Sequence, residues 1–220
     1  DDGSLFWTHG DGTQVGGTPT PEQVEILQRI ANPLGKMFRI DPITGEGYSD
    51  NPFYNGDTSS IESKIYSYGH RNPWRFTVHP ETGEPFSGDV GWTNWEEINT
   101  GRGVNFGWPL FEGGNGESTR TEAIGGDPDF QYLYDDASEV TPAIYAFRHR
   151  ENGGSAVVLG DFYTGTAYPE LYDGALFYAN FNKGDVNALT FDSEGNVDSA
   201  VPFLENERGL TQIAMGTDSN

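Results

Sequence analysis

Residues 65–108 read IYSYGHRNPWRFTVHPETGEPFSGDVGWTNWEEINTGRGVNFGW and decide the fold class. Short runs of β-branched and aromatic residues alternate there with Gly, Asn, Asp and Pro, which form tight turns. Comparable runs occupy residues 36–41, 143–147 and 175–179. Short strands between frequent turns predict an all-β protein. The polar residues that gather where these strands end predict a binding site built on the sheets.

One segment, residues 20–31, predicts a helix. Thr20 is suited to cap it, Pro21 to occupy its first turn, and Gln23 to complete a capping box. Its apolar residues recur at helical spacing and share one face: Val24, Leu27 and Ile30. The helix is therefore expected to be short and to pack against the sheets through that face.

The stretch from Glu112 to Glu139 is rich in Gly, Asp, Glu, Ser and Thr, and it lacks periodicity. It predicts a long surface excursion between strands. Four of its aspartates are candidates for a surface calcium ion: Asp127, Asp129, Asp135 and Asp136. Their spacing lacks the glycine and the terminal glutamate of an EF-hand loop, so a solvated acidic loop is the favoured interpretation.

A weak internal repeat predicts a β-propeller. Residues 2–7 (DGSLFW), 82–86 (TGEPF) and 173–178 (DGALFY) each place a tight turn before an aromatic strand, as propeller blades do. The same turn begins again at residues 216–220. At ~40 to 50 residues per four-stranded blade, we expect one partial propeller domain over residues 1–220, truncated at both ends.

Charge and composition exclude several classes of partner. The chain has 34 acidic and 12 basic side chains, a formal net charge of -22, which repels phosphate backbones and anionic lipid heads. Nucleic acid is therefore not an expected partner. No apolar run approaches the ~20 residues that span a bilayer, so membrane insertion is not expected either. The chain has no cysteine, which excludes disulfides, thiol catalysis and thiolate metal sites.

Motifs of common enzyme classes are missing from the sequence. It has no phosphate-binding glycine loop, no HExxH and no Gly-x-Ser-x-Gly, so hydrolase and nicotinamide chemistry find no support. The four histidines, none at helical metal-ligand spacing to another, are His9, His70, His79 and His149. A zinc site is not expected, and for each histidine a surface or structural position is the favoured interpretation.

Five segments together resemble a known family: LGKMFRID at 34–41, DNPF at 50–53, GHRNPW at 69–74, EEIN at 96–99 and NFGWP at 105–109. Their order is similar to that of the glucose/sorbosone dehydrogenase family, the soluble quinoprotein sugar dehydrogenases. The likeness continues through residues 153–155, 162–165 and 172–178. It implies a six-bladed propeller of four-stranded antiparallel sheets that binds pyrroloquinoline quinone (PQQ) and calcium.

The resemblance also implies which residues hold the cofactor. Arg71 and Asn72 match the Arg-Asn pair that contacts PQQ in the family. The planar guanidinium of an arginine is suited to bind a carboxylate. Lys183 and Arg208 match later cationic positions that face the cofactor. From the residues alone, Arg71 is equally a structural arginine and Lys183 a solvated residue at a hairpin tip.

The resemblance implies two calcium positions. Gly91 and Trp92 fall where family members offer backbone carbonyls to the active-site calcium. Glu97 and the carbonyl of Phe106 fall near a second, structural calcium. Carbonyl and carboxylate oxygens are the ligands that calcium prefers.

The expected activity is oxidation of an aldose or related sugar at its anomeric carbon, with hydride transfer to the quinone and reoxidation by an external electron acceptor. The family's catalytic histidine matches a segment upstream of residues 1–12, and its members suggest a periplasmic or extracellular location. Trp74 and Val90 replace polar residues of the family. The alternative is therefore a non-catalytic, calcium-stabilised propeller that binds glycans or proteins through Trp74, Trp92 and Trp95, or a purely structural module.

Overall fold

The computed structural model describes residues 3–12, 19–92, 94–113, 118–122, 124–137, 139–149, 155–205, 207 and 209–216. The chain divides into two compact units. Unit 1 consists of Asp1–Pro73 and Gly101–Ala143, and unit 2 consists of Trp74–Thr100 and Ile144–Asn220. Arg208, a predicted cofactor residue, lies outside the described residues.

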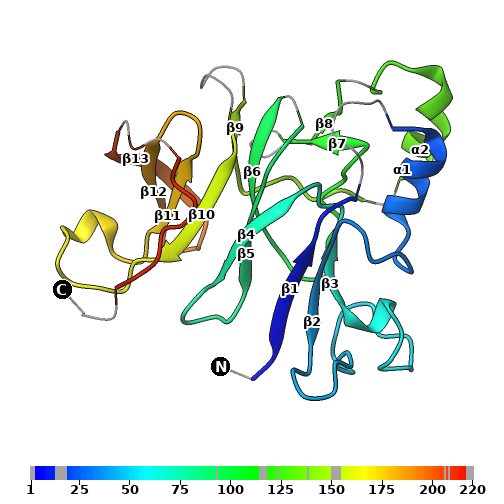
Figure 1. Cartoon of the computed structure of the whole chain (residues 1–220), viewed down its shortest axis with the longest axis horizontal. Helices are drawn as coiled ribbons and strands as arrows, with labels where there is room; N and C mark the ends of the chain where they lie inside the picture. Colours follow the sequence, from blue (N-terminus) through cyan, green and yellow to red (C-terminus); the bar gives the residue numbers. More distant parts are fainter. Residues whose placement is uncertain are drawn as a thin grey trace. The chain divides into compact units, whose positions relative to one another are not determined.

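Unit 1 is built on a three-stranded antiparallel sheet in chain order, which Figure 1 shows in blue and cyan. Its strands are β1 (Leu5–His9), β2 (Lys36–Ile40) and β3 (Ile65–Tyr68). Helix α1 (Pro21–Gln28) lies between β1 and β2 in the sequence, and the short helix η1 (Glu62–Lys64) leads into β3. The remainder of unit 1 contains β7 (Phe111–Glu112), β8 (Thr119–Arg120), η2 (Pro128–Phe130) and α2 (Gln131–Asp135).

Unit 2 contains two four-stranded antiparallel sheets. One is formed by β4 (Pro73–Val78), β5 (Pro85–Asp89), β6 (Trp95–Thr100) and β9 (Tyr145–Arg148). The other is formed by β10 (Val157–Phe162), β11 (Leu176–Asn180), β12 (Asp185–Phe191) and β13 (Val197–Leu204), with η3 (Glu170–Tyr172) before β11. Both are up-and-down meanders, so the prediction of four-stranded antiparallel blades is confirmed.

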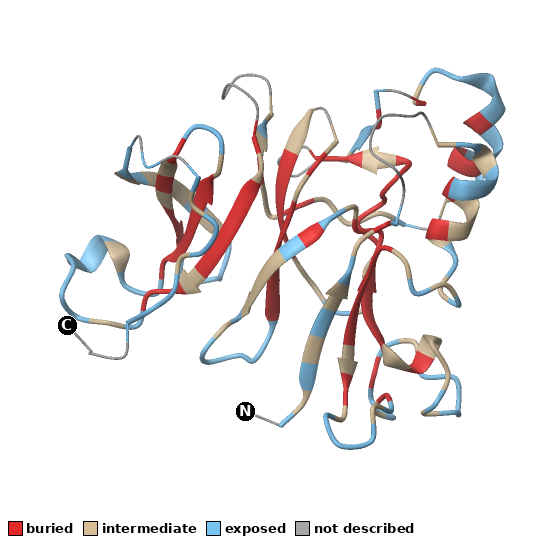
Figure 2. Cartoon of the chain, in the orientation of Figure 1, coloured by how far each residue is buried: buried red, intermediate tan, exposed pale blue. Residues whose placement is uncertain are grey.

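The core of unit 2 lies between its two sheets. Alternate residues of the strands meet there, and the fully buried ones include Ile98, Val157, Leu176 and Leu189. Figure 2 shows the buried residues of β10 and β11 as nearly continuous red. Gly88 permits the close approach, because a Cβ at this position would lie 3.1 Å from the Cβ of Leu159. Face-to-face packing of apolar strand faces is what stabilises stacked sheets of this kind.

A glycine with positive φ precedes the strand in three of the four repeats predicted from the sequence, and residues 217–220 of the fourth repeat lie outside the described residues. Gly3, Gly83 and Gly174 precede β1, β5 and β11 and have φ values of 74°, 75° and 69°. This left-handed conformation strains a residue that has a Cβ, so glycine is favoured at the turn. The repeat therefore reflects one turn geometry that is used before three strands.

Helix α1 has the predicted capping box. Thr20 Oγ1 accepts a hydrogen bond from the backbone N–H of Gln23, and Gln23 Oε1 accepts one from the N–H of Thr20. The helix ends at Gln28, earlier than the predicted residue 31, because Arg29 has an extended backbone with ψ of 131°. Among the described residues, no helix is long and apolar enough to cross a membrane.

The excursion over residues 112–139 has more structure than the sequence indicates. It contains the five-residue helix α2, and its apolar residues join a small core of unit 1 that includes Val24, Leu110, Phe130 and Leu133. A helix this short shows no full period of apolar residues, which is why the periodicity argument misses it. Tertiary packing, rather than a local pattern, stabilises this five-residue helix.

Lys36 is fully buried at the start of β2 and binds the end of α1. Its Nζ donates hydrogen bonds to the carbonyl oxygens of Leu27 at 2.8 Å and Leu34 at 2.7 Å, and it lies 5.6 Å from the ring centre of Tyr68. Burial lowers the pKa of Lys36 to about 8. The lysine joins helix, loop and strand at the cost of desolvating its charge.

We expect the free energy of unfolding to rise with pH between about 8 and 10.5 through Lys36. In that window the unfolded chain still binds the proton that the folded chain has released, so deprotonation favours the folded state. The gain between pH 8 and 9.5 should be roughly 2 kcal/mol. Urea unfolding across this range should show the slope in the wild type and in Lys64→Met but not in Lys36→Met, and an unchanged slope in Lys36→Met would contradict the assignment.

A buried carboxylate links the two sheets of unit 2. Glu96 in β6 is fully buried; its Oε1 lies 2.8 Å from Nδ1 of His149, and its Oε2 accepts a hydrogen bond of 2.8 Å from the backbone N–H of Val157 in β10. His149 in turn donates its backbone N–H to the carbonyl of Asn94. Glu96 therefore ties β6, the start of β10 and the segment after β9 to one another.

Glu96→Ala should destabilise the protein by about 1 to 3 kcal/mol, because it leaves the buried N–H of Val157 without its acceptor and removes the partner of the half-buried imidazole of His149. Glu96→Gln retains a carbonyl acceptor and should lose less. Chemical denaturation would measure both, with the exposed Glu81→Ala as the control. Equal losses of stability for Glu96→Ala and Glu81→Ala would show that the contacts of Glu96 with His149 and Val157 do not stabilise the protein.

Candidate functional site

The backbone of Arg71 and Asn72 lies in the connection from β3 to β4, as the sequence predicted. His70, immediately before them, is buried; its Nε2 lies 3.0 Å from Ser67 Oγ, and its ring centre lies 4.9 Å from that of Phe106. The carbonyl of Arg71 accepts a hydrogen bond of 2.8 Å from the backbone N–H of Asp11. The connection is therefore held at a fixed position while Arg71 remains partly exposed and Asn72 exposed.

Two glycines allow other segments to reach this connection. Gly69 has φ of 77°, and a Cβ there would collide with Oδ1 of Asn105. Gly35 has φ of 64°, and a Cβ there would lie 2.6 Å from the carbonyl oxygen of His70. The close contacts exclude any larger residue, so the glycines of the GHRNP and LGK segments have a direct structural reason.

Arg71 belongs to a cluster with Trp108 and Asp11, which we call the Arg71 cluster. Its guanidinium carbon lies 5.5 Å from the ring centre of Trp108. The indole Nε1 of Trp108 donates a hydrogen bond of 2.8 Å to Asp11 Oδ2, and both of these side chains are buried. A cation on an indole face, with the indole orientation fixed by a carboxylate, is a suitable cradle for a planar anionic ligand.

Sequence reasoning missed Asp11 and Trp108 as members of the site. Trp108 was named only as part of the NFGWP segment of the family resemblance, and Asp11 was not selected. The expectation that binding residues gather where strands end applies to Asp11 as well, because Asp11 follows the end of β1. The contact between the two could not be found this way, since 97 residues separate them.

A glutamine from α1 supports the backbone of Trp108. Gln28 Nε2 donates a hydrogen bond of 2.5 Å to the carbonyl of Trp108, and Gln28 Oε1 accepts one of 2.9 Å from Asn105 Nδ2. Asn105 Oδ1 accepts a further bond of 2.9 Å from the N–H of Gly107. The helix end therefore fixes the segment that carries the indole of the Arg71 cluster.

The predicted calcium ligands are divided between the units. Gly91 and Trp92 lie in the turn between β5 and β6, and Glu97 lies in β6, all in unit 2, whereas Phe106 lies in unit 1. Gly91 and Glu97 are buried, and Glu97 Oε2 accepts a hydrogen bond of 3.0 Å from Asn99 Nδ2. Where the structure describes the chain, no group of three or more His, Asp or Glu side chains could hold a metal ion. Calcium here would depend on carbonyl oxygens, as the prediction for Gly91 and Trp92 assumes.

Glu97 belongs to a polar face of the β5–β6 ladder. Ser87 is the Cα partner of Asn99, and Asp89 is the partner of Glu97, so these side chains share one face. All four are buried. Within the described part of the chain, Ser87 Oγ and Asn99 Oδ1 have no hydrogen-bond partner. A buried face of oxygens with unsatisfied acceptors suits a hard cation and fits calcium chemically.

Lys183 lies at the turn between β11 and β12, and its ammonium forms an ion pair with Asp185. The side chain is about half exposed and lines a small polar cavity of about 140 Å³, together with Tyr145 and Tyr178. The two tyrosine hydroxyls are hydrogen-bonded at 3.1 Å, and burial strongly raises the pKa of Tyr178. The structure therefore agrees with a hairpin-tip position, and the role of Lys183 toward a cofactor stays a prediction.

The tryptophans of the alternative binding groove lie at one end of the β4–β5–β6 sheet. Trp74 is 42% exposed and stacks with Arg75, whose guanidinium carbon lies 5.0 Å from the ring. The guanidinium of Arg148 lies only 4.0 Å from the ring of Trp95. One face of Trp95 is therefore covered, and Trp74 offers the more accessible ring.

The remaining sequence candidates have structural roles. Asp127 caps η2 by accepting a hydrogen bond from the N–H of Asp129, and Asp135 accepts one from Gln131, which agrees with an acidic loop rather than a calcium loop. His79 Nδ1 accepts hydrogen bonds from two backbone N–H groups of its turn, at residues 81 and 82. His79 therefore has a structural position in its turn, in agreement with the interpretation favoured for the histidines.

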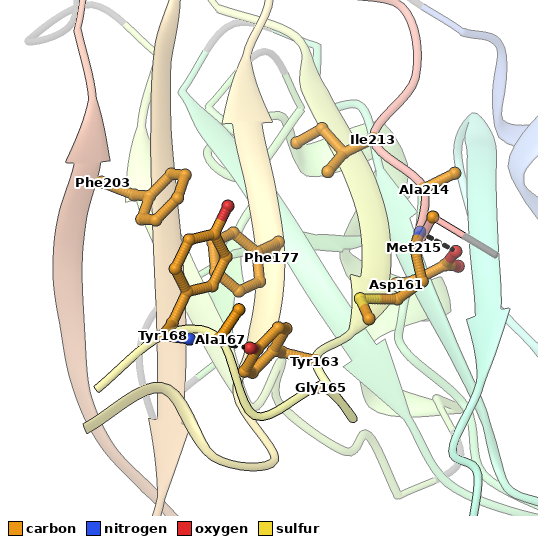
Figure 3. A pocket seen from close by; sticks show the side chains of 11 residues that line it. Asp161, Tyr163, Gly165, Ala167, Tyr168, Phe177, Phe203, Ile213, Ala214 and Met215 are labelled. Carbon is orange, nitrogen blue, oxygen red and sulfur yellow. Dashed lines mark hydrogen bonds between the residues drawn. The ribbon is translucent and has the colours of Figure 1, made fainter. Parts of the chain in front are cut away.

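Unit 2 also contains an apolar cavity of about 270 Å³ beside the end of β10 (Figure 3). Its aromatic wall consists of Tyr168, Phe177 and Phe203. The carboxylate of Asp161 accepts a hydrogen bond of 3.0 Å from the N–H of Met215, and the hydroxyl of Tyr163 accepts one of 2.9 Å from the N–H of Tyr168. Because these polar groups bind backbone, the cavity offers apolar packing rather than a reactive centre.

Four-stranded antiparallel meanders that stack face to face are the blades of a β-propeller, which is the fold of this chain. The sequence profile of the glucose / sorbosone dehydrogenase family matches residues 1–220. The chain belongs to this family.

Relatives with known names include enzymes and plant proteins. The HIPL2 protein of Arabidopsis thaliana is 29% identical over 226 residues, which cover 92% of this chain and 30% of that protein. The aldose sugar dehydrogenase YliI of Escherichia coli is 34% identical over 109 residues, which cover 49% of this chain and 26% of the enzyme. The chain thus corresponds to a minor part of each relative.

Solved structures share the fold. A glucose dehydrogenase of Thermus thermophilus has a TM-score of 0.65 and 26% identity, and the match covers 99% of this chain and 55% of that one. The PQQ-bound aldose sugar dehydrogenase of Streptomyces coelicolor has a TM-score of 0.62 and 22% identity, covering 96% and 49%. The chain spans about half the length of these enzymes.

Asp11→Ala should lower the free energy of unfolding by about 1 to 3 kcal/mol, because it leaves the buried indole N–H of Trp108 without an acceptor. Asp11→Asn retains an oxygen acceptor and should lose less. Urea unfolding gives the energies, and the indole N–H resonance of Trp108 reports the bond. If that resonance were identical in wild type and Asp11→Ala, the hydrogen bond would not exist in solution.

Proposed function

We propose that this protein acts as a PQQ- and calcium-dependent sugar dehydrogenase that oxidises an aldose or related sugar at its anomeric carbon. Membership of the glucose/sorbosone dehydrogenase family supports a sugar substrate and an oxidoreductase activity. The observation that carries the proposal is the Arg71 cluster, in which a partly exposed guanidinium lies on the face of an indole whose orientation is fixed by a buried carboxylate.

In this proposal the residues of the chain bind the cofactor and orient it. Arg71 presents N–H donors in a planar fork that matches a carboxylate of PQQ, and the side chain of Asn72 adds a donor and an acceptor beside it. Lys183, and Arg208 outside the described residues, are proposed as further cations for the same ligand. When bound, the quinone supplies the redox chemistry and calcium polarises its carbonyl.

Backbone and carboxylate oxygens would hold the metal. The carbonyls of Gly91 and Trp92 are proposed for the calcium beside the quinone, and Glu97 with the carbonyl of Phe106 for a structural calcium. The buried oxygen-rich face around Glu97 supports a hard cation over zinc or copper, which prefer nitrogen and sulfur.

The remaining properties follow from this function. A neutral sugar suits a protein whose charge of -22 disfavours anionic substrates. Reoxidation of the quinone requires an external electron acceptor, and we propose a periplasmic or extracellular location, as the family resemblance implies. Nucleic acid and membrane insertion have no part in it.

A non-catalytic binding propeller is the second candidate. It is favoured by the 42% exposed ring of Trp74, an aromatic platform of the kind that binds sugar faces, and by the match of HIPL2 over 92% of the chain. In this interpretation the protein binds glycans or proteins, and calcium only stabilises the fold.

Calorimetric titration of PQQ, with calcium present, tests the proposal. The wild type should show saturable binding, and Arg71→Ala should weaken it roughly ten-fold or more, because a charge-assisted contact is lost. Arg102→Ala removes an equal charge elsewhere in unit 1 and should bind like wild type. Absence of heat from the folded wild type would favour the binding propeller, and equal weakening in both variants would indicate a general effect of charge.

A further inference from the structure

Unit 1 contains a cavity of about 430 Å³ between α1 and α2. Its buried floor is apolar and is formed by Val24, Leu110 and Leu133. Polar side chains of the two helices surround this floor: Glu25, Gln28 and Arg29 from α1, and Asp136 at the end of α2. The volume lies within the range of small-molecule sites.

The lining favours a neutral, hydroxyl-rich ring. Tyr132 is 47% exposed and lines the cavity with an aromatic ring, which suits the C–H face of a sugar. Arg29 is already paired with Glu25 at 2.5 Å, so the carboxylate of Asp136 leaves the cavity with an excess of negative charge. In a chain of charge -22, this excess disfavours an anion, while carboxylate and amide oxygens accept hydrogen bonds from hydroxyl groups.

Gln28 connects the cavity to the Arg71 cluster. Its side chain lines the cavity and binds both the carbonyl of Trp108 and the side-chain amide of Asn105. An amide has two N–H donors and two acceptor positions, so one of each is left for a ligand. A ligand that binds Gln28 therefore acts on the residue that holds Trp108, whose indole lies against Arg71.

We propose that the cavity between α1 and α2 is a second sugar site, distinct from the Arg71 cluster, and that its occupancy is transmitted to Trp108 through Gln28. The choice of a sugar as ligand rests on the proposed function, whereas the connection through Gln28 rests on the geometry alone. Coupling of this kind is reciprocal, so a ligand at the Arg71 cluster would alter sugar affinity in the cavity by the same factor.

Binding can be measured without turnover and without cofactor. Methyl α-maltoside has a blocked anomeric carbon and cannot be oxidised there, so NMR titration of the cofactor-free protein reports binding alone. Tyr132→Ala should weaken binding roughly five-fold or more through loss of the aromatic face. Tyr54→Ala removes a tyrosine of similar exposure, 39%, outside the cavity and should have no effect.

The outcomes separate this site from the proposed function. Binding that is weakened by Tyr132→Ala but not by Arg71→Ala supports the cavity, whether or not PQQ binds. Binding that is weakened by Arg71→Ala and unchanged in Tyr132→Ala would place the sugar at the Arg71 cluster and overturn the proposal. Absence of saturable binding would overturn it as well, even if PQQ binding were normal.

The link from the cavity through Gln28 to Trp108 can be measured separately from sugar affinity. The indole N–H resonance of Trp108, identified by its loss in Trp108→Phe, should shift when methyl α-maltoside binds. Gln28→Leu has a similar size and should abolish this shift; if it fails to fold, Gln28→Glu removes the N–H donors to the carbonyl of Trp108 and should do the same. A shift that persists in a folded Gln28 variant would show that the cavity is not linked to Trp108 through this side chain.

Discussion

Hydrogen bonds from three distant segments meet on the backbone of residues 69–73, and the site of unit 1 depends on this convergence. The N–H of Asp11 binds the carbonyl of Arg71, the N–H of His70 binds the carbonyl of Gly35, and the N–H of Trp108 binds the carbonyl of Gly69. Each bond fixes one of these segments relative to residues 69–71. A flexible loop could present an arginine, but only a loop held at several points can present it in one place before a ligand arrives.

Local pattern predicted the regular elements well. The runs at residues 36–41, 65–68 and 175–179 correspond to β2, β3 and β11. The capping box of α1 is present because it needs only Thr20 and Gln23, which are three residues apart. Such features depend on neighbours in sequence, so sequence is sufficient to find them. The five-residue helix α2 depends instead on contacts with residues such as Val24 and Leu110, more than 20 residues away, and no local pattern indicates it.

The residues of the site show the same difference between what sequence predicts and what distant contacts determine. Arg71 and Asn72 were predicted from the family resemblance, and the structure places them directly after the end of β3. Asp11, Gln28 and Trp108 were not, because an aspartate after a strand, a glutamine in a helix and a tryptophan in a core each have an ordinary local explanation. Their role appears only through hydrogen bonds that join residues 80 and 97 positions apart. The calcium assignments rest on family resemblance and need a metal titration rather than further inspection of the sequence.

The acidity of the chain constrains the binding of an anionic cofactor that we propose. With 34 acidic side chains against 12 basic ones, the long-range field opposes a ligand that carries carboxylates. The opposing field is screened beyond about 8 Å at physiological salt, whereas a guanidinium in direct contact acts without such screening. A fixed local cation therefore decides the outcome, and Arg71 has that position because Trp108 supports its guanidinium and the N–H of Asp11 holds its backbone. In the proposed function the same field would attract calcium to the buried oxygens around Glu97. The acidic composition that favours the metal would then leave binding of the anionic cofactor dependent on very few residues.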